Sequence, residues 1–110
     1  DAGRAKSVGR RVFLESEGKL VEVEGKSYAD TFRKTIEMIG VERVRELNII
    51  RSGRNIVYEL EAGDTPGEGQ LDLGNGLYLD THQSSIDKDA LLQRISEALH
   101  ITIQVVRESN

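Results

Sequence analysis

The spacing of apolar residues along this chain predicts short antiparallel hairpins interrupted by amphipathic helices. Apolar runs at 12–14 and 20–23 flank Glu17-Gly18. This dipeptide suits a two-residue turn, because glycine tolerates a positive φ. A second hairpin is predicted over residues 48–60, with its turn at Ser52-Gly53.

A third hairpin is predicted by Gly74-Asn75-Gly76, which separates two leucine-rich runs. With all three residues in the loop, Leu71 pairs with Leu79 and Leu73 pairs with Leu77. The four leucines then share one face of the hairpin, whereas a two-residue Asn-Gly loop would divide them between two faces. We therefore expect the longer loop. The preceding residues contain the only proline and three glycines, so a surface loop is expected there (61–69).

Two main helices are predicted by apolar residues that recur every three or four positions. The first begins after Ser27, an N-cap residue with Asp30 three positions on, and ends at Gly40. Its apolar face contains Tyr28, Phe32, Ile36 and Ile39. The face of the second contains Leu91, Leu92, Ile95 and Leu99. A further short helix is expected over 41–47, and a final strand over 101–106.

These elements predict an α+β fold, arranged as a two-layer sandwich. Its sheet of hairpins would be mostly antiparallel, with the two main helices packed on the face that carries Leu77 and Leu79. The last helix-to-strand step would add one parallel neighbour. We expect a single domain over residues 11–110. Residues 1–10 are small, polar and basic, which is typical of a linker or tag remnant, and we favour a linker from a longer protein.

Composition favours one compact domain with a well-solvated surface. The chain has 110 residues, of which 37% are apolar and 31% charged. The absence of cysteine excludes disulfides and thiol catalysis and fits a reducing compartment. No apolar run approaches the about 20 residues that cross a bilayer. We therefore expect a cytoplasmic protein without membrane contact, and no motif predicts a cofactor.

Charge is distributed unevenly, with a net value of −4. Residues 1–54 hold 12 Lys and Arg against 9 Asp and Glu, and residues 55–110 hold 3 against 10. Only the first half therefore offers a basic surface for nucleic acid. The candidate contacts are Arg51 and Arg54 beside the Ser52-Gly53 turn, and Arg10 and Arg11 near the N-terminus. Charged residues also occur at hairpin tips and linkers without binding anything, and this alternative stays open.

The densest group of short polar and titratable side chains lies between Asp80 and Asp89, at a predicted helix start. A helix N-terminus favours an anion, so this group predicts a phosphate or carboxylate site. Its members are His82, Ser84, Ser85 and Lys88. A simple helix cap also explains the pattern, because Ser84 and Asp87 have the spacing of a capping box. Both interpretations stay open here.

No catalytic residue and no metal site is predicted. Ser84 and Ser85 lack the G-x-S-x-G context of a nucleophile. A catalytic zinc needs three protein ligands, whereas His100 is separated from His82 by a whole helix.

The segments SYADTFRKTIEMIGVERVRELNI and GLYLDTHQSSIDKDALLQRISEAL resemble small accessory domains appended to prokaryotic restriction and other DNA-processing proteins. The resemblance covers about residues 27–100 and brings no catalytic motif. It implies that the partners are other domains of a parent protein and, through that parent, DNA.

The leading hypothesis is a non-catalytic accessory module of a larger cytosolic protein that makes protein or nucleic-acid contacts. The alternative is a small hydrolase or phosphate-handling enzyme centred on His82.

Overall fold

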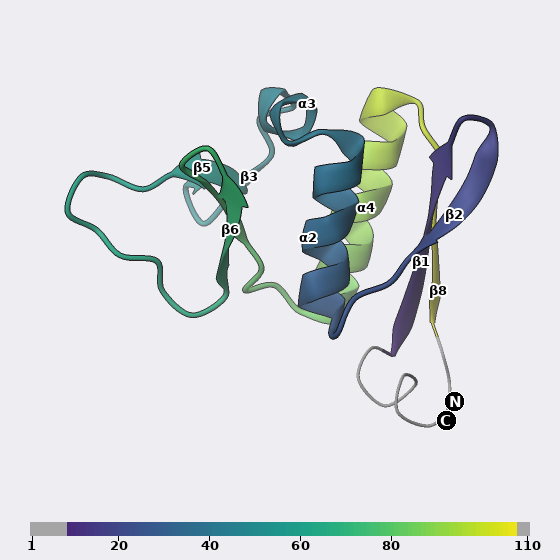
Figure 1. The fold of residues 1–110 in the computed structure, drawn as a ribbon, viewed down its shortest axis with the longest axis horizontal. Helices are drawn as coiled ribbons and strands as arrows, with labels where there is room; N and C mark the ends of the chain where they lie inside the picture. Colours follow the sequence, from purple (N-terminus) through teal and green to yellow (C-terminus); the bar gives the residue numbers. More distant parts are fainter. Residues whose placement is uncertain (1–8, 108–110) are drawn as a thin grey trace.

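Two three-stranded antiparallel sheets lie on opposite sides of a helical layer (Figure 1). A computed structural model of the chain describes residues 9–107. The first sheet has the order β2-β1-β8 and consists of β1 (Arg10–Ser16), β2 (Lys19–Val23) and β8 (Ile103–Arg107). The second has the order β5-β7-β6 and consists of β5 (Val57–Glu59), β6 (Gln70–Gly74) and β7 (Leu77–Asp80). A separate hairpin pairs β3 (Ile50–Arg51) with β4 (Arg54–Asn55).

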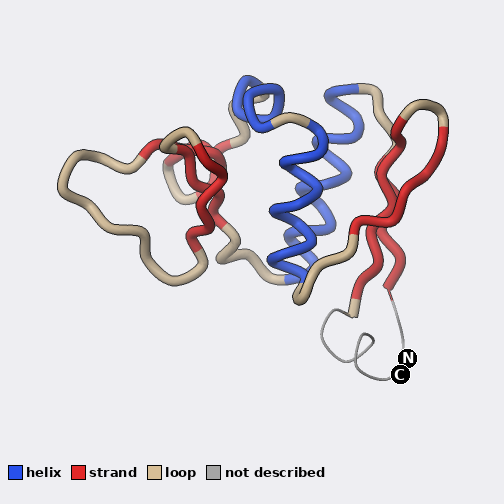
Figure 2. The backbone as a smooth tube through the Cα atoms, in the orientation of Figure 1, coloured by secondary structure: helices blue, strands red, loops and turns tan. Residues whose placement is uncertain are grey.

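The predicted α+β fold is confirmed, with a different arrangement of its strands. The helices are α2 (Tyr28–Ile39), α3 (Val41–Glu46) and α4 (Ser85–Leu99). Figure 2 shows α2 and α4 between strands on both sides, rather than on one face of a single sheet. The buried face of α2 is wide, because Thr31 and Thr35 are buried beside its apolar residues. Such a helix can pack against two sheets at once.

One hydrophobic core joins both sheets to the helical layer. Its fully buried side chains come from every layer and include Val12, Phe32, Ile36, Leu79, Leu92 and Ile95. Leu99 is only partly buried and packs at the margin of this core. The prediction that Leu99 is buried as deeply as the rest of the apolar face of α4 was therefore wrong.

The boundaries of α2 follow the predicted caps. The Ser27 side chain accepts a hydrogen bond from Asp30 N at 3.1 Å. The Asp30 carboxylate accepts one from Lys26 N at 2.9 Å, one residue before the position expected in a capping box. At the other end Gly40 has a φ of 121° and donates its N–H to Ile36 O. Both predicted ends are confirmed.

The third hairpin contains one of its two predicted leucine pairs and differs from the prediction at its turn. Asn75-Gly76 form a two-residue turn with Gly74 opposite Leu77, and Leu71 lies opposite Leu79 as predicted. The register shifts between Asp72 and Gly74. A β-bulge of this kind adds one residue to a strand, here Leu73, and so restores the alternation. The predictions of a three-residue loop and of a pairing between Leu73 and Leu77 were therefore wrong.

The final strand runs antiparallel to β1, with Leu14 opposite Ile103, so the predicted parallel neighbour was wrong. The reason is that α4 carries the chain from one sheet to the other, and β7 and β8 never become neighbours. β1 already begins at Arg10, and residues 1–8 of the expected linker lie outside the described residues. None of the helices within residues 9–107 has the length and apolar character needed to span a membrane.

Burial in α4 sets a stability test. Leu92 is fully buried, so Leu92→Ala should lower the free energy of unfolding by about 2–5 kcal/mol. Leu99→Ala should cost clearly less, because that side chain is only partly removed from water. Urea denaturation of both variants measures the difference. Equal losses would contradict the placement of Leu99 at the core margin.

Candidate functional site

The segment between β7 and α4, which contains His82 and Ser84 of the predicted anion site, is held by its own hydrogen bonds. Thr81 donates from both its N–H and its Oγ1 to Gly69 O, each at 2.7 Å. Gln83 Nε2 donates to Asp80 O at 2.8 Å, and His82 N donates to Asp80 Oδ1 at 3.0 Å. The loop is therefore ordered by the chain itself.

Lys88 lies beneath this loop and is buried, with 6% of its surface exposed. Its Nζ donates to Thr81 O at 2.9 Å and to Gln83 O at 2.5 Å. Burial lowers the pKa of the ammonium, and the nearby carboxylates of Asp80 and Asp87 act in the opposite direction. The charge of Lys88 is thus directed at loop carbonyls, and it fixes the loop to the start of α4.

The other members of the predicted anion site lie at the surface. Ser84 Oγ accepts from Asp87 N at 3.1 Å, which confirms the helix cap. His82 and Ser85 are exposed. The His82 ring packs so closely on Gly69 that a Cβ there would lie 2.3 Å from His82 Cδ2. Anion binding stays a prediction. The side chains exposed for it are those of His82, Ser84 and Ser85, whereas Lys88 is buried.

The two arginines of the β3–β4 hairpin have separate contacts. Arg51 lies 3.3 Å from a carboxylate oxygen of Asp87, so the hairpin reaches the first turn of α4. The guanidinium of Arg54 stacks over the ring of Tyr58, 3.7 Å from its centre. The structure thereby brings Arg51 next to the predicted anion site, a proximity that no sequence signal indicated.

Arg10 and Arg11 belong to the opposite side of the molecule. Figure 1 shows β1 across the helical layer from β3, so the four predicted arginines do not form one basic surface. Arg10 Nε donates to both carboxylate oxygens of Asp89, at 3.2 and 3.1 Å. Arg11 contacts Glu22 through two nitrogens, at 3.0 and 2.9 Å.

Asp89 connects the strands β1 and β8 to the helices. Besides Arg10, it accepts the Tyr28 hydroxyl at 2.5 Å and lies 3.5 Å from Arg107 Nε. Burial, and after it the hydrogen bond to Asp89, raise the pKa of Tyr28. This network joins β1 and β8 to α2 and α4, and its role is structural.

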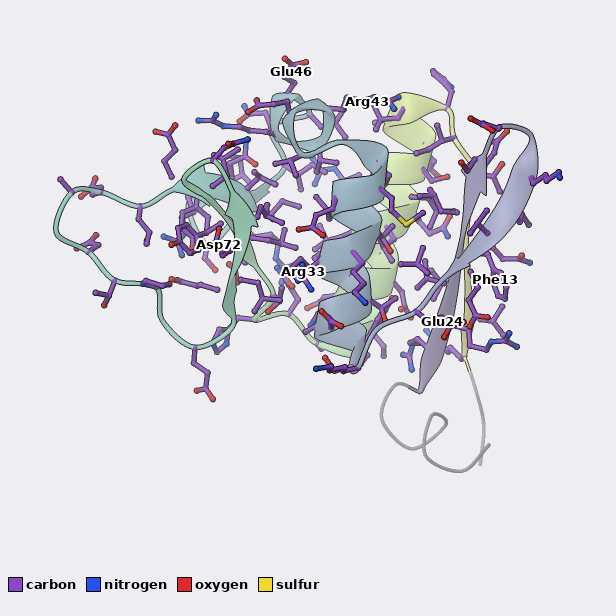
Figure 3. The ribbon with its side chains drawn as sticks, in the orientation of Figure 1. Phe13, Glu24, Arg33, Arg43, Glu46 and Asp72 are labelled. Carbon is purple, nitrogen blue, oxygen red and sulfur yellow. The ribbon has the colours of Figure 1, made fainter. Side chains whose placement is uncertain are left out.

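A groove between β2 and α2 was missed by the sequence analysis. We call it the β2–α2 groove; it has a volume of about 320 Å³ and is lined by Glu22, Val23, Glu24, Lys34, Glu37 and Met38. Met38 is 50% exposed, and Val21, on the same side of β2 as Val23, is 41% exposed. Figure 3 labels Glu24 near this sheet and Arg33 on α2. One signal was available, since Met38 stands at the margin of the apolar stripe of its helix.

A larger hollow of about 650 Å³ lies between α3 and β5. Within it Arg45 lies 3.9 Å from Glu42 and 3.7 Å from Glu59. Such exposed pairs are typical of a solvated surface.

Comparison with known proteins identifies no relative: no protein-family model, no curated protein and no solved structure matches the chain. Within residues 9–107, no three His, Asp or Glu side chains gather closely enough to hold a metal ion.

The buried lysine gives a pH-dependent test. Lys88→Met should lower the free energy of unfolding by about 1–3 kcal/mol at neutral pH, because the carbonyls of Thr81 and Gln83 lose their hydrogen-bond donor. Burial lowers the pKa of Lys88 in the folded protein, so the unfolded chain binds this proton more tightly. The free energy of unfolding of the wild type therefore rises with pH between the folded-state pKa of Lys88 and its ordinary value of 10.5. The stability gap between wild type and variant should therefore widen toward pH 10.5. Urea denaturation across this range would contradict the assignment if the gap stayed constant.

Proposed function

We propose that this chain is a non-catalytic interaction module of a larger protein, and that it contacts a protein partner through the β2–α2 groove. The observation that carries the proposal is the exposure of Val21. It lies opposite Leu14, so the two side chains share the face of the sheet that packs on the helices. Leu14 is 3% exposed and Val21 is 41% exposed, so the inner face of β2 is left uncovered at Val21.

The neighbouring residues extend this uncovered surface. Met38 is half exposed on the helix side of the groove. Its flexible, polarisable side chain suits a surface that adapts to a partner. β2 is also the outer strand of its sheet, and an outer strand beside apolar side chains is a common place for protein contacts. A partner that covers this groove would complete a face that the chain itself leaves open.

The cellular context is a further part of the proposal. The resemblance over residues 27–100 supports a cytoplasmic parent protein that acts on DNA. Arg51 and Arg54 support a direct DNA contact, because the ion pair of Arg51 is exposed and so exchanges readily for a phosphate.

Selection from a displayed library of random peptides tests the protein-contact proposal. Peptides enriched on the purified chain should lose binding to Met38→Glu, which places a charge in the groove. The matched control is Ile86→Glu, because Ile86 is also exposed, at 61%, but lies on α4. Ligands that respond to the control variant instead, or no enrichment at all, would contradict the proposal.

DNA binding has its own test. Duplex DNA should bind at about 50 mM salt and release steeply as salt rises, because each neutralised phosphate frees counterions. Reversing the charges of Arg51 and Arg54 should weaken binding with little loss of stability, since both residues lie at the surface. Fluorescence anisotropy measures the affinity. Undetectable binding at low salt would remove DNA as a direct partner.

A further inference from the structure

We propose that the β2–α2 groove receives an extended segment of the partner, which adds as a strand to the edge of β2 and alternates apolar with basic residues. This inference rests on the proposed function and names the class of partner. It follows from three features of the groove: the direction of the backbone in β2, the apolar side chains beside it, and the charge of its lining.

The backbone direction follows from the register of the first hairpin. Glu15 lies opposite Leu20, and its N–H donates to Thr102 O on the β8 side of β1. Glu15 therefore does not bond across to Leu20, and the two form a non-hydrogen-bonded pair. In such a pair the N–H and C=O of Leu20 point away from β1. Within residues 9–107, no other strand lies on that side of β2.

The two outer strands of this sheet differ in how they are covered. At β8, Gln93 of α4 donates its side-chain N–H to Ile103 O at 3.2 Å, so α4 occupies the edge at the first residue of that strand. At β2 the comparable contact lies just beyond the strand, where Lys34 Nζ donates to Glu24 O at 3.0 Å. Lys34 thus closes one end of the groove, and Leu20 lies toward the open end.

Apolar contacts select an extended segment with alternating side chains. A strand placed about 4.8 Å from β2 directs every second side chain to the helix side. There it would meet Val23, which is buried, and Val21 and Met38, which are about half exposed. Apolar residues at alternate positions of the partner would cover these two side chains.

The charge of the groove selects basic residues at the remaining positions. Three glutamates and one lysine line it. The Lys34 ammonium is directed at Glu24 O and lies 3.9 Å from Asp30, outside the lining. Glu22 is paired with Arg11 at 2.9 Å, and Glu37 is paired with Arg33 at 3.2 Å. Within the described residues the Glu24 carboxylate forms no ion pair, so Glu24 is the main site for a basic side chain of the partner. A second copy of this chain would bring the same glutamate-rich lining to the groove, so like charges disfavour self-pairing.

A synthetic peptide of about eight residues, a common strand length, tests the inference. It alternates valine with lysine and is titrated into isotope-labelled full chain. Chemical shifts should move in β2 and along the groove face of α2. Methylating two backbone nitrogens that face β2 should weaken binding about tenfold, because two hydrogen bonds are lost. A peptide that alternates valine with glutamate should not bind.

Variants of the chain test the charge argument. Replacing Glu24 and Glu37 by glutamine should weaken the valine–lysine peptide about fivefold and reduce its salt dependence. The matched control replaces Glu42 and Glu46, two exposed glutamates of α3, and should leave binding unchanged.

The outcomes separate the two proposals. Equal binding of the acidic or the N-methylated peptide, or shifts confined to other elements, would overturn strand addition. If library peptides bind at the groove while the valine–lysine peptide does not, the interaction module stands and this inference fails. If neither kind of peptide binds, both fail. Concentration-dependent self-association through β2, without peptide binding, would replace the partner by a second copy of the chain.

Discussion

The structure depends on one constraint, which is that α2 must bury side chains against two sheets at once. Phe32 and Ile36 are completely buried, and Thr31 and Thr35 widen the same face. A single helix can cover only a limited width of sheet. It covers the central strand β1, where Val12 is fully buried, but not the whole of the outer strand β2, where Val21 remains exposed. The β2–α2 groove is a direct consequence of this limited coverage.

Charged side chains in this molecule serve mainly to hold its parts together. The Lys88 ammonium is directed at two carbonyls of the loop before α4, and the Asp89 carboxylate joins the terminal strands to both main helices. In both cases the charge satisfies polar groups within the fold, although the sequence analysis had assigned Lys88 to an anion site. This is the ordinary requirement for burying a charge, because an unpaired one would be very costly. The groove differs, since the Glu24 carboxylate has no such structural partner among residues 9–107.

Local features of the fold could be predicted because they depend on neighbouring residues alone. The caps at Ser27 and Ser84, the turn at Glu17-Gly18 and the pairing of Leu71 with Leu79 all follow from side chains within a few positions of one another. The bulge at Leu73 was missed, because turn chemistry favoured Asn75-Gly76 while the apolar pattern required one extra residue. The bulge in β6 allows the two-residue Asn75-Gly76 turn and the extra residue to occur together.

The sequence by itself determined the α+β class, the helix ends and which residues could carry charge to a surface. Only the tertiary structure decided that the strands form separate sheets on both sides of the helices, that Lys88 faces inward, and that Arg51 lies beside the start of α4. The physical reason is that periodicity shows which residues seek burial but not which distant element will cover them. That choice depends on how widely each helix covers a sheet, and it left Val21 and Met38 exposed beside an open strand.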